Sequence, residues 1–425
     1  MKDSININRI PDETARAIVD PAAYAEWDSL HRKLVALRRD HPFAQGELDG
    51  YDPFWVAAKY EDIQTVARRN DVFLSGVRAL EPSKVLKALE AMGGPARSVV
   101  EMNEPEHRKH RLLTQAWFQP KNIGHLEDRF RTVARRYVDR LANSGGECDF
   151  ATVAGVHYPL LVIMSILGIP DQDEEMVLRI AQEVLAPDDP DFGRTGGRLM
   201  DPEERARTAR AVREDASAYF RELSAARKHH PSDDLATVIA NAVIDGEPIT
   251  DVNALGYYLT IITAGHDTTS SSMAGAVWAL AERPEELAKV KDDLGLIPNL
   301  VDEAVRWTTP VHQFTRTAAC DFEVRGQHIT KGDRVILLFP SGNRDEDIFE
   351  DPFMFKADRA TNKQIGFGYG VHMCLGMHLA RMEMRIFFEE LLPRLTHLEL
   401  AGEPRRTFTN FVGGPKSVPI RYRMN

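Results

Sequence analysis

Residues 366–376 read GFGYGVHMCLG and set Cys374 among four glycines. Glycine has no Cβ, so it lets the backbone come close to a large flat group and tolerates positive φ angles in a tight loop. The following stretch, from Leu375 to Leu392, is amphipathic and predicts a helix. A cysteine at the start of a helix feels the positive end of the helix dipole, which favours the thiolate. The pattern predicts a thiolate in a loop that approaches a flat ligand, as an axial ligand of haem iron does.

Three other interpretations of this loop fit less well. A phosphate-binding loop would end in Lys-Ser/Thr between a strand and a helix, and this loop does not. A zinc site would need further Cys or His ligands at short, regular spacing, and none follows. A buried, unreactive thiol is the usual fate of a lone cysteine, and we expect that fate for Cys148 and Cys320.

A second unusual stretch lies inside a long apolar segment. Residues 251–282 predict a helix of about 32 residues, about 48 Å long. Its middle, Ala264–Ser272, reads AGHDTTSSS, and such residues weaken a buried helix by hydrogen-bonding their own backbone. Thr268 shares a helix face with Ala264, so its hydroxyl can bond the Ala264 carbonyl or release it. A local break in a consistent helix is typical of a functional site, and a helix kink without function is the alternative.

The rest of the chain is mainly helical with a small β portion. A periodicity of 3.6 residues predicts further helices, and short alternating runs predict strands. The expected helices are 28–39, 61–67, 122–141 and 202–227, and the expected strands are 54–58, a hairpin of 322–324 and 327–329 turning at Arg325-Gly326, and 334–339. Because strands and helices do not alternate, a Rossmann-type fold is disfavoured.

The charge and the cysteine content exclude other classes. Lys and Arg total 53 against 64 Asp and Glu, and the net charge of −11 argues against a nucleic-acid binder. Three cysteines make no disulfide framework and favour a reducing compartment. The N-terminus has no apolar signal segment, and the longest apolar run, Leu160–Ile169, is too short to span a bilayer. We therefore expect a cytoplasmic protein without a membrane anchor.

The loop around Cys374 resembles the signature of the cytochrome P-450 superfamily, the haem-thiolate monooxygenases. That signature, Phe-Gly-x-Gly-x-His-x-Cys-x-Gly, is matched without departure by Phe367, Gly368, Gly370, His372, Cys374 and Gly376. The resemblance covers nearly the whole chain, is closest to the bacterial terpineol-oxidising subgroup and is strongest in TAGHDTTSSS, LVDEAVRWT and NFVGGPKSVPIR. It implies the cytochrome P-450 fold, a triangular helical prism enclosing haem b, in a single domain over residues 1–425 with no fused reductase.

The resemblance also implies roles for individual residues. Cys374 would ligate the iron, and Asp267 with Thr268 would form an acid–alcohol pair that delivers protons. Other haem contacts would be His107, Arg111, Ala264, Gly265, Arg316, Phe367, Gly368, His372 and Gly376, with His107, Arg111, Arg316 and His372 at the propionates and Trp117 near the haem edge. The substrate pocket would be lined by Thr260, Thr263, Ala264, Val311, Phe314, Phe411 and Val412. Glu303, Arg306 and Arg359 would form a buried structural ion-pair network.

These residues imply a monooxygenase that uses O2 to hydroxylate a small hydrophobic substrate, with terpenoid, aromatic and steroid-like compounds all open. Electrons would come from a 2Fe-2S-type ferredoxin and its NAD(P)H-dependent reductase, which would dock on Arg108, Lys109, Arg381 and Arg385. Two irregular stretches, 83–97 and 186–198, are either lids or ordinary connections. Two alternatives stay open, a peroxide-driven haem-thiolate enzyme and a haem-binding sensor or carrier without turnover.

Overall fold

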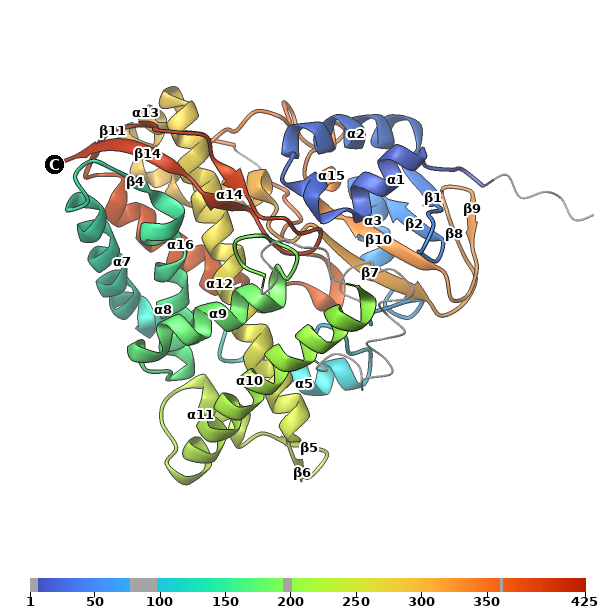
Figure 1. Ribbon diagram of the computed structural model, residues 1–425, viewed down its shortest axis with the longest axis horizontal. Helices are drawn as coiled ribbons and strands as arrows, with labels where there is room; N and C mark the ends of the chain where they lie inside the picture. Colours follow the sequence, from blue (N-terminus) through green and yellow to red (C-terminus); the bar gives the residue numbers. More distant parts are fainter. Residues whose placement is uncertain (1–6, 77–97, 194–200, 360–361) are drawn as a thin grey trace, which may run out of the picture.

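The computed structural model describes residues 7–76, 98–193, 201–359 and 362–425. These residues are mostly helical, with several small sheets (Figure 1). The longer helices are α1 (Asp12–Val19), α2 (Trp27–Asp40), α3 (Tyr60–Arg68), α5 (Glu106–Gln115), α7 (Glu127–Ala142), α8 (His157–Leu167), α9 (Glu174–Leu185), α10 (Pro202–His229), α11 (Leu235–Ala240), α12 (Asp251–Glu282), α13 (Pro284–Asp292), α14 (Ile297–Thr308) and α16 (Met377–Leu391), and α6 (Pro120–Ile123) and α15 (Phe339–Gly342) are single turns. The expected fold class, mainly α with a small β portion, is confirmed.

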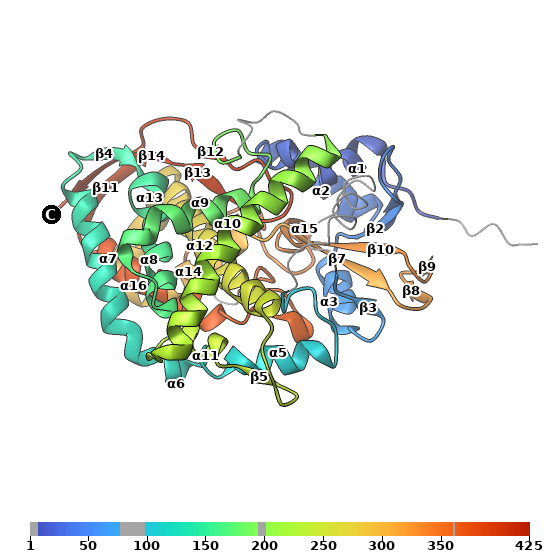
Figure 2. The same ribbon diagram turned by 60° about the horizontal axis from the view of Figure 1, so that its bottom comes forward.

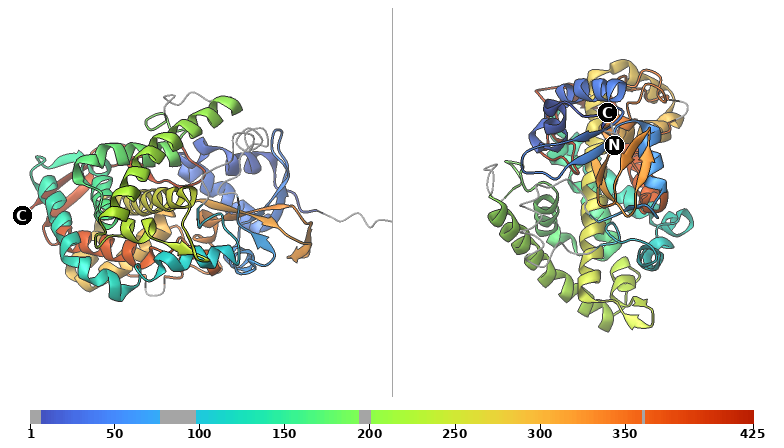
Figure 3. Two further views of the ribbon diagram at one scale, coloured as in Figure 1. Left: turned by 90° about the horizontal axis from the view of Figure 1, so that it is seen from below. Right: turned by 90° about the vertical axis from the view of Figure 1, so that its right-hand side faces the viewer.

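Helix α12 has the bounds that the sequence predicted and runs through the helical part of the molecule (Figure 1). Thr250 caps its first turn by accepting a hydrogen bond from the Asn253 amide at 3.3 Å. Side chains are buried on all sides of the helix, not on a single apolar face. Packing against α8, α14 and α16 therefore stabilises it. In the left view of Figure 3 the helices around α12 lie to one side and the N-terminal helices with the larger sheet to the other.

Most strands belong to two sheets. The larger sheet has the order β1-β2-β10-β7-β3, in which β2 and β10 are parallel and the other neighbours antiparallel. It lies beside α1 and α2, away from α7 and α8 (Figure 2). Its strands are β1 (Phe43–Gly46), β2 (Phe54–Ala57), β3 (Phe73–Leu74), β7 (Gln313–Ala318) and β10 (Arg334–Leu338). The second sheet joins β11 (Leu395–Leu400), β14 (Pro419–Met424) and β4 (Glu147–Asp149), and the two-stranded pairs are β5 (Val243–Ile244) with β6 (Glu247–Pro248), β8 (Phe322–Val324) with β9 (Gln327–Ile329), and β12 (Arg405–Arg406) with β13 (Pro415–Ser417).

The β8–β9 hairpin is confirmed with its predicted bounds and turn. Arg325 and Gly326 have φ angles of 48° and 72°. Two consecutive residues with positive φ are typical of the type I′ turn, whose twist matches that of the flanking strands.

The predicted helix 122–141 is wrong at its start. The chain forms α6, a 3-10 turn at Gly124–Leu126, and only then α7. Glycine favours a helix interior less than other residues except proline, so Gly124 is a natural place for the tighter turn. The helix after Cys374 also starts two residues later than predicted, at Met377.

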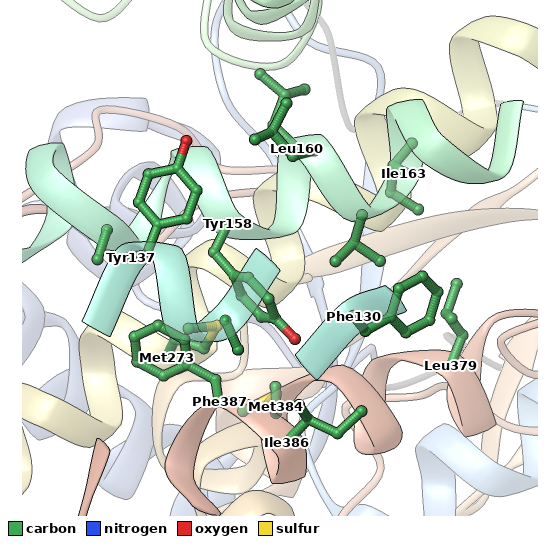
Figure 4. Close-up of a cluster of buried hydrophobic side chains, with 14 of the residues drawn as sticks. Phe130, Tyr137, Tyr158, Leu160, Ile163, Met273, Leu379, Met384, Ile386 and Phe387 are labelled. Carbon is green, nitrogen blue, oxygen red and sulfur yellow. The ribbon is translucent and has the colours of Figure 1, made fainter. Parts of the chain in front are cut away.

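Helices α7, α8 and α16 share a core of buried aromatic side chains (Figure 4). The rings of Tyr158 and Phe387 lie 5.1 Å apart between centroids, and Phe130 is fully buried nearby. The Tyr158 hydroxyl donates to the Glu383 carbonyl at 2.9 Å, so its polar end is also satisfied. This core fixes α16, and with it the Cys374 loop, against the centre of the molecule.

Glu303, Arg306 and Arg359 meet in a buried ion-pair network. The Glu303 carboxylate accepts two bonds of 2.7 Å from Arg306 and one of 2.9 Å from Arg359. The Lys356 amide donates to the same carboxylate at 2.9 Å. All three charged side chains are buried, so their remaining hydrogen bonds to backbone carbonyls are what make the burial tolerable.

The two irregular stretches, 83–97 and 186–198, for which a lid and an ordinary connection were both open, differ in what the structure describes. Residues 83–97 lie outside the described residues. Of 186–198, the described part contains Asp189, whose carboxylate is fully buried and accepts bonds of 2.7 and 2.9 Å from Lys416 of β13. The Phe408 amide also donates to it at 2.8 Å. This part of the α9–α10 connection is therefore tied to the C-terminal strands.

Candidate active site

The Cys374 loop depends on two glycines in the left-handed region. Gly368 and Gly370 have φ angles of 73° and 74°, which other residues adopt only with strain. A Cβ on Gly370 would also lie 2.4 Å from the Ala67 carbonyl oxygen at the end of α3. The loop closes with a hydrogen bond of 2.8 Å from the Cys374 amide to the Phe367 carbonyl. These contacts hold the Cys374 sulfur three residues before the first turn of α16.

A cavity separates this loop from α12. Its volume is about 230 Å³. Its walls include Cys374, Phe367, Gly368 and Gly376 from the loop, and Thr260, Ala264, Gly265 and Thr268 from α12. The other wall residues are mostly apolar, among them Val99, Val100, Leu337, Phe339 and Leu379. A mostly apolar cavity with a few polar groups is typical of a cofactor and substrate site.

The protonation of Cys374 differs from the expectation. Burial raises the pKa of its thiol, and the opposing effects of the Gly376 amide, Arg111 and Arg381 do not overcome it. The helix start alone therefore does not produce the thiolate, and a bound metal ion must displace the proton. Among the described residues, no group of three or more His, Cys, Asp or Glu side chains is placed to hold a metal ion.

Four basic side chains gather at one end of the cavity. His107, Arg111, Arg316 and His372 all line it. Arg316 is buried, and its recorded hydrogen bond goes to the Thr315 carbonyl at 3.1 Å, while Arg111 donates to the Met373 carbonyl at 2.8 Å. Burial lowers the pKa of Arg316 to about 10, and burial with the charge of Arg316 lowers that of His372 to about 3.

These groups are suited to an anionic ligand. Neither guanidinium has a carboxylate partner in the described part of the chain, and the buried Nε2 of His107 has no partner either. The rings of His107 and His372 lie 4.2 Å apart between centroids with their planes tilted by 44°, and Glu104 and Ser75 hydrogen-bond one nitrogen of each. A buried cation without a counter-charge is costly, so this end of the cavity fits a flat ligand that carries carboxylates.

The polar stretch of α12 faces the cavity along one side. The Thr268 hydroxyl donates to the Ala264 carbonyl at 2.6 Å, as the spacing predicted. Gly265 allows close packing, since a Cβ there would lie 2.4 Å from the Ile163 side chain of α8. Asp267, the residue before Thr268, is partly buried but does not belong to the cavity walls, and burial raises the pKa of its carboxyl to about 7. The pair thus combines a hydroxyl with an acid that exchanges its proton near neutral pH.

Several predicted pocket residues lie elsewhere. Thr260, Ala264, Val311 and Phe314 line the cavity, but Thr263, Phe411, Val412 and Trp117 do not belong to its walls. A helix turns by about 100° per residue, which takes Thr263 off the cavity face, and its hydroxyl donates to the Leu259 carbonyl at 2.7 Å.

The other corrections come from local packing. Phe411 packs edge-on against Phe314, with centroids 5.5 Å apart, and so lies behind a wall residue. Val412 is buried and forms a β-bridge with Val311. Trp117, which was expected to pack near the haem edge, is not a wall residue, whereas its neighbour Phe118 is.

Glu383 is a site residue that the sequence analysis missed. It lines the cavity from α16, is buried, and accepts a hydrogen bond of 2.9 Å from Thr269 of α12. Its second carboxyl oxygen has no partner, and burial raises the pKa of the group well above its ordinary value. The sequence contains a signal for this residue: Glu383 is charged, yet it lies on the otherwise apolar face of the predicted helix between Leu379 and Phe387.

The expected docking cations are mostly neutralised. Lys109 pairs with Asp245, Arg381 with Asp302 at 2.8 Å, and Arg385 with Glu127 and Glu389 at 3.0 and 2.7 Å. Arg108 is exposed and has no recorded partner among the described residues. The four side chains therefore do not form the continuous positive surface that the sequence suggested.

A planar dianion whose metal accepts sulfur would satisfy the cysteine, the glycine loop and the unpaired cations together. Haem is such a ligand, and the class of protein that this site defines is that of the haem-thiolate proteins. Residues 22–420 match the family model described as Cytochrome P450, and the chain belongs to that family. The protein is accordingly a P450 monooxygenase, an oxidoreductase that incorporates one oxygen atom, with iron protoporphyrin IX as cofactor.

Relatives and solved structures agree with this assignment. The chain is 43% identical to Cytochrome P450-terp of Pseudomonas sp over 97% of its own length and 98% of the relative's. It is 31% identical to a Steroid C26-monooxygenase of Rhodococcus jostii (strain RHA1), over 95% of this chain and 84% of the relative. The crystal structure of CYP108D1 from Novosphingobium aromaticivorans DSM12444 matches with a TM-score of 0.90 and 40% identity, covering 99% of this chain and 100% of that one. The expected family, fold, enzyme class and cofactor are confirmed.

The structure also bears on membrane association. Among the residues that it describes, no helix has both the length and the apolar character to cross a bilayer.

The raised pKa of Asp267 predicts a specific pH dependence of stability. In the unfolded chain this carboxyl ionises near its ordinary value of about 4, and in the folded chain near 7. Between these values only the folded state keeps the proton, so the free energy of unfolding should fall as pH rises from about 4 to 7 and level off above. In thermal unfolding of the haem-loaded protein, Asp267→Asn should flatten this slope. The matched variant Asp251→Asn, at the exposed start of α12, should keep it, and an unchanged slope in Asp267→Asn would refute the shift.

Proposed function

We propose that the protein hydroxylates a small hydrophobic substrate, of terpenoid, aromatic or steroid-like structure, with O2 and with electrons from a separate ferredoxin. The observation that carries this proposal is the apolar cavity between Cys374 and Thr268, whose α12 wall offers few polar groups. The Thr260 hydroxyl is buried in that wall without a partner, so it is available to a substrate oxygen. The relatives named for terpene and steroid chemistry support the same range of substrates.

The chain offers a holder for each part of haem. Cys374 would supply the sulfur ligand of the iron, and Arg111, Arg316, His107 and His372 would hold the carboxylates. When bound, haem supplies the redox-active iron at which O2 is split and one oxygen atom is passed to the substrate. The apolar side chains around the ring exclude bulk water, which strengthens every polar interaction within the cavity.

The proton supply is assigned to Asp267 and Thr268. The Thr268 hydroxyl can donate into the cavity once it releases the Ala264 carbonyl, to which it is bonded at 2.6 Å. A carboxyl with a pKa of about 7 is half protonated at neutral pH, so Asp267 can both give up a proton and recover one. Proton delivery by this pair is the role that distinguishes a monooxygenase from a peroxide-driven enzyme.

The decisive experiment combines binding, spectrum and turnover. The reduced protein treated with carbon monoxide should show the absorption of a thiolate-ligated haem, and a panel of terpenoids, arenes and steroids should shift the spin state of the ferric form. A compound that shifts it should be hydroxylated with NAD(P)H and a ferredoxin pair. Turnover with peroxide alone would favour the peroxide-driven alternative, and ligand binding without NAD(P)H consumption would favour the sensor.

Thr268→Ala is expected to separate electron use from product formation. Haem binding should persist, whereas the fraction of NAD(P)H that yields hydroxylated product should fall about ten-fold or more, with peroxide released instead. Thr263→Ala is the matched control, since that hydroxyl also bonds a carbonyl four residues earlier but lies off the cavity. Full conversion of NAD(P)H to product in Thr268→Ala would contradict the assigned role.

The partner surface is assigned around Arg108 of α5. This cation is exposed one helical turn before Leu112, an exposed apolar side chain, and Arg111 of the same helix donates to the Met373 carbonyl in the Cys374 loop at 2.8 Å. Arg108→Glu should slow the first electron transfer several-fold at low ionic strength and less at high ionic strength, because the charges steer the encounter. Arg32→Glu, an exposed site on α2, should leave the rate unchanged. Equal rates in both variants would remove Arg108 from the docking surface.

A further inference from the structure

A second group of buried basic side chains lies around Trp27, and none of its members belongs to the cavity walls. Arg406 of β12 stacks on the Trp27 ring, with its guanidinium carbon 3.8 Å from the ring centroid. Arg344, which follows α15, lies 5.5 Å from the same centroid. The imidazoles of His31 and His312 lie 4.6 and 5.6 Å from it. Four segments of the chain thus bring basic groups to one aromatic ring.

These groups are deeply buried and incompletely bonded. Arg344 is 1% exposed and Arg406 is 7% exposed. Arg344 donates to the Trp307 carbonyl at 2.7 Å, but its Nη1 has no partner, and neither does Nη2 of Arg406. Both ring nitrogens of His31 are also buried without a partner. Buried donors of this kind are rare in native proteins unless a solvent molecule or ion satisfies them.

The neighbouring carboxylates are already engaged. Glu346 accepts a bidentate pair from Arg38, at 2.9 and 2.7 Å. Glu303 is shared between Arg306 and Arg359. Asp28 of α2 acts on Arg406 through space, but it is exposed and no hydrogen bond joins the two in the described chain. Two guanidinium charges therefore remain buried without a direct counter-charge.

The protonation of the two histidines determines which of their ring nitrogens can donate a hydrogen bond to a ligand. His312 donates from Nδ1 to the Thr409 carbonyl at 3.1 Å, so the Nε2 of its neutral ring is an acceptor. Burial, and after it the charge of Arg406, lowers the pKa of His312 to about 3, and burial with Arg344 and Arg38 lowers that of His31 well below its ordinary value. Both rings are neutral at pH 7, so the free donors come from the two arginines and one nitrogen of His31.

We propose that Arg344 and Arg406, with an N–H of His31, bind a small monovalent inorganic anion of the size of chloride or nitrate beside Trp27. A water molecule can satisfy a donor but cannot offset a buried charge, whereas an anion does both. The cation–π contact with Trp27 offsets part of the charge of Arg406 and orients its free edge. The anion joins α2 to the segment after α15 and to β12, so it stabilises the attachment of the N-terminal helices.

The test compares anions at constant ionic strength. Thermal unfolding of the haem-loaded protein in sodium bromide should show a saturable rise in Tm of about 2 °C or more over sodium gluconate, whose anion is too bulky for a buried site. Crystals grown in bromide should show an anomalous peak beside Arg406. The rise should vanish in Arg406→Met and persist in Arg405→Met, the adjacent arginine, which is exposed and paired with Asp191.

Three results would contradict an anion site beside Trp27. Equal Tm values in bromide and gluconate, a rise retained in Arg406→Met, or density explained by water alone would each overturn the proposal. If Arg406→Met does not fold, Arg406→Lys is the second variant, because it keeps the charge but loses the planar donor edge. The bromide concentration that gives half of the rise in Tm should then be measurably higher than in the wild-type protein. Bromide binding in the wild-type protein, seen by the anomalous peak, is independent of every variant.

Discussion

Replacement of Cys374 by serine is expected to abolish hydroxylation and to remove the absorption of a thiolate-ligated haem from the reduced, carbon-monoxide-treated protein. A serine hydroxyl in the same loop has the same reach as the thiol, but it does not provide the soft, electron-rich ligand on which oxygen cleavage depends. Since burial raises the pKa of the thiol, the ligand forms only when the iron displaces its proton. Haem affinity should therefore fall together with activity.

The other two cysteines are the controls for this result. Cys320 is exposed and Cys148 is partly buried beside Tyr422, and neither lines the cavity. Cys320→Ser and Cys148→Ser should keep the spectrum and the turnover of the parent protein. A thiolate-type spectrum that survives in Cys374→Ser, or one that disappears in either control, would show that the ligand has been assigned to the wrong sulfur.

The second large effect concerns Glu303. Its replacement by glutamine is expected to destabilise the fold by about 3–5 kcal/mol, because Arg306 and Arg359 would be left as buried charges without a counter-charge. All three side chains lie in the interior, so solvent cannot screen the loss. Denaturant unfolding of the haem-loaded protein would measure the change as a lower midpoint at an unchanged slope.

A surface pair gives the matching control. Glu389 pairs with Arg131 and Arg385 at 2.7 Å, but both arginines keep other carboxylate partners and all three side chains are partly exposed. Glu389→Gln should cost less than about 1 kcal/mol. If Glu303→Gln were equally mild, the buried network would contribute little to stability, and the arginines would have to be satisfied by their backbone partners alone.

The parts of the fold that the sequence predicted well are those with strong local signals. Helix α12 has the predicted bounds because Thr250 caps it and Arg283 is followed by Pro284, which begins the next helix. The β8–β9 turn was predictable because Arg325-Gly326 supplies a glycine where positive φ is needed. The loop of Cys374 was recognisable because its backbone geometry requires glycines at fixed positions, and these glycines are visible in the sequence.

Other features depend on contacts that no local pattern encodes. Thr260 and Thr263 look equivalent in the sequence, and because α12 is buried all round, periodicity does not tell which of them faces the cavity. The charges of Arg381 and Arg385 suggested a docking surface, but Asp302, Glu127 and Glu389 come from other turns and helices to neutralise them. Glu383 escaped notice because its partner, Thr269, is more than a hundred residues away.

The ion pair of Asp189 and Lys416 has a consequence for how the chain tolerates change at its C-terminus. The two residues are 227 positions apart, yet Asp189 would become an interior charge without a cation if Lys416 were lost, whereas Lys416 would keep Asp191 at 2.9 Å. Removing the C-terminal residues back past β13 would therefore destabilise the connection between α9 and α10, which is distant from the cut in the sequence. Any engineered fusion at the C-terminus therefore has to leave the terminal strands intact, so that they keep their contacts with that loop.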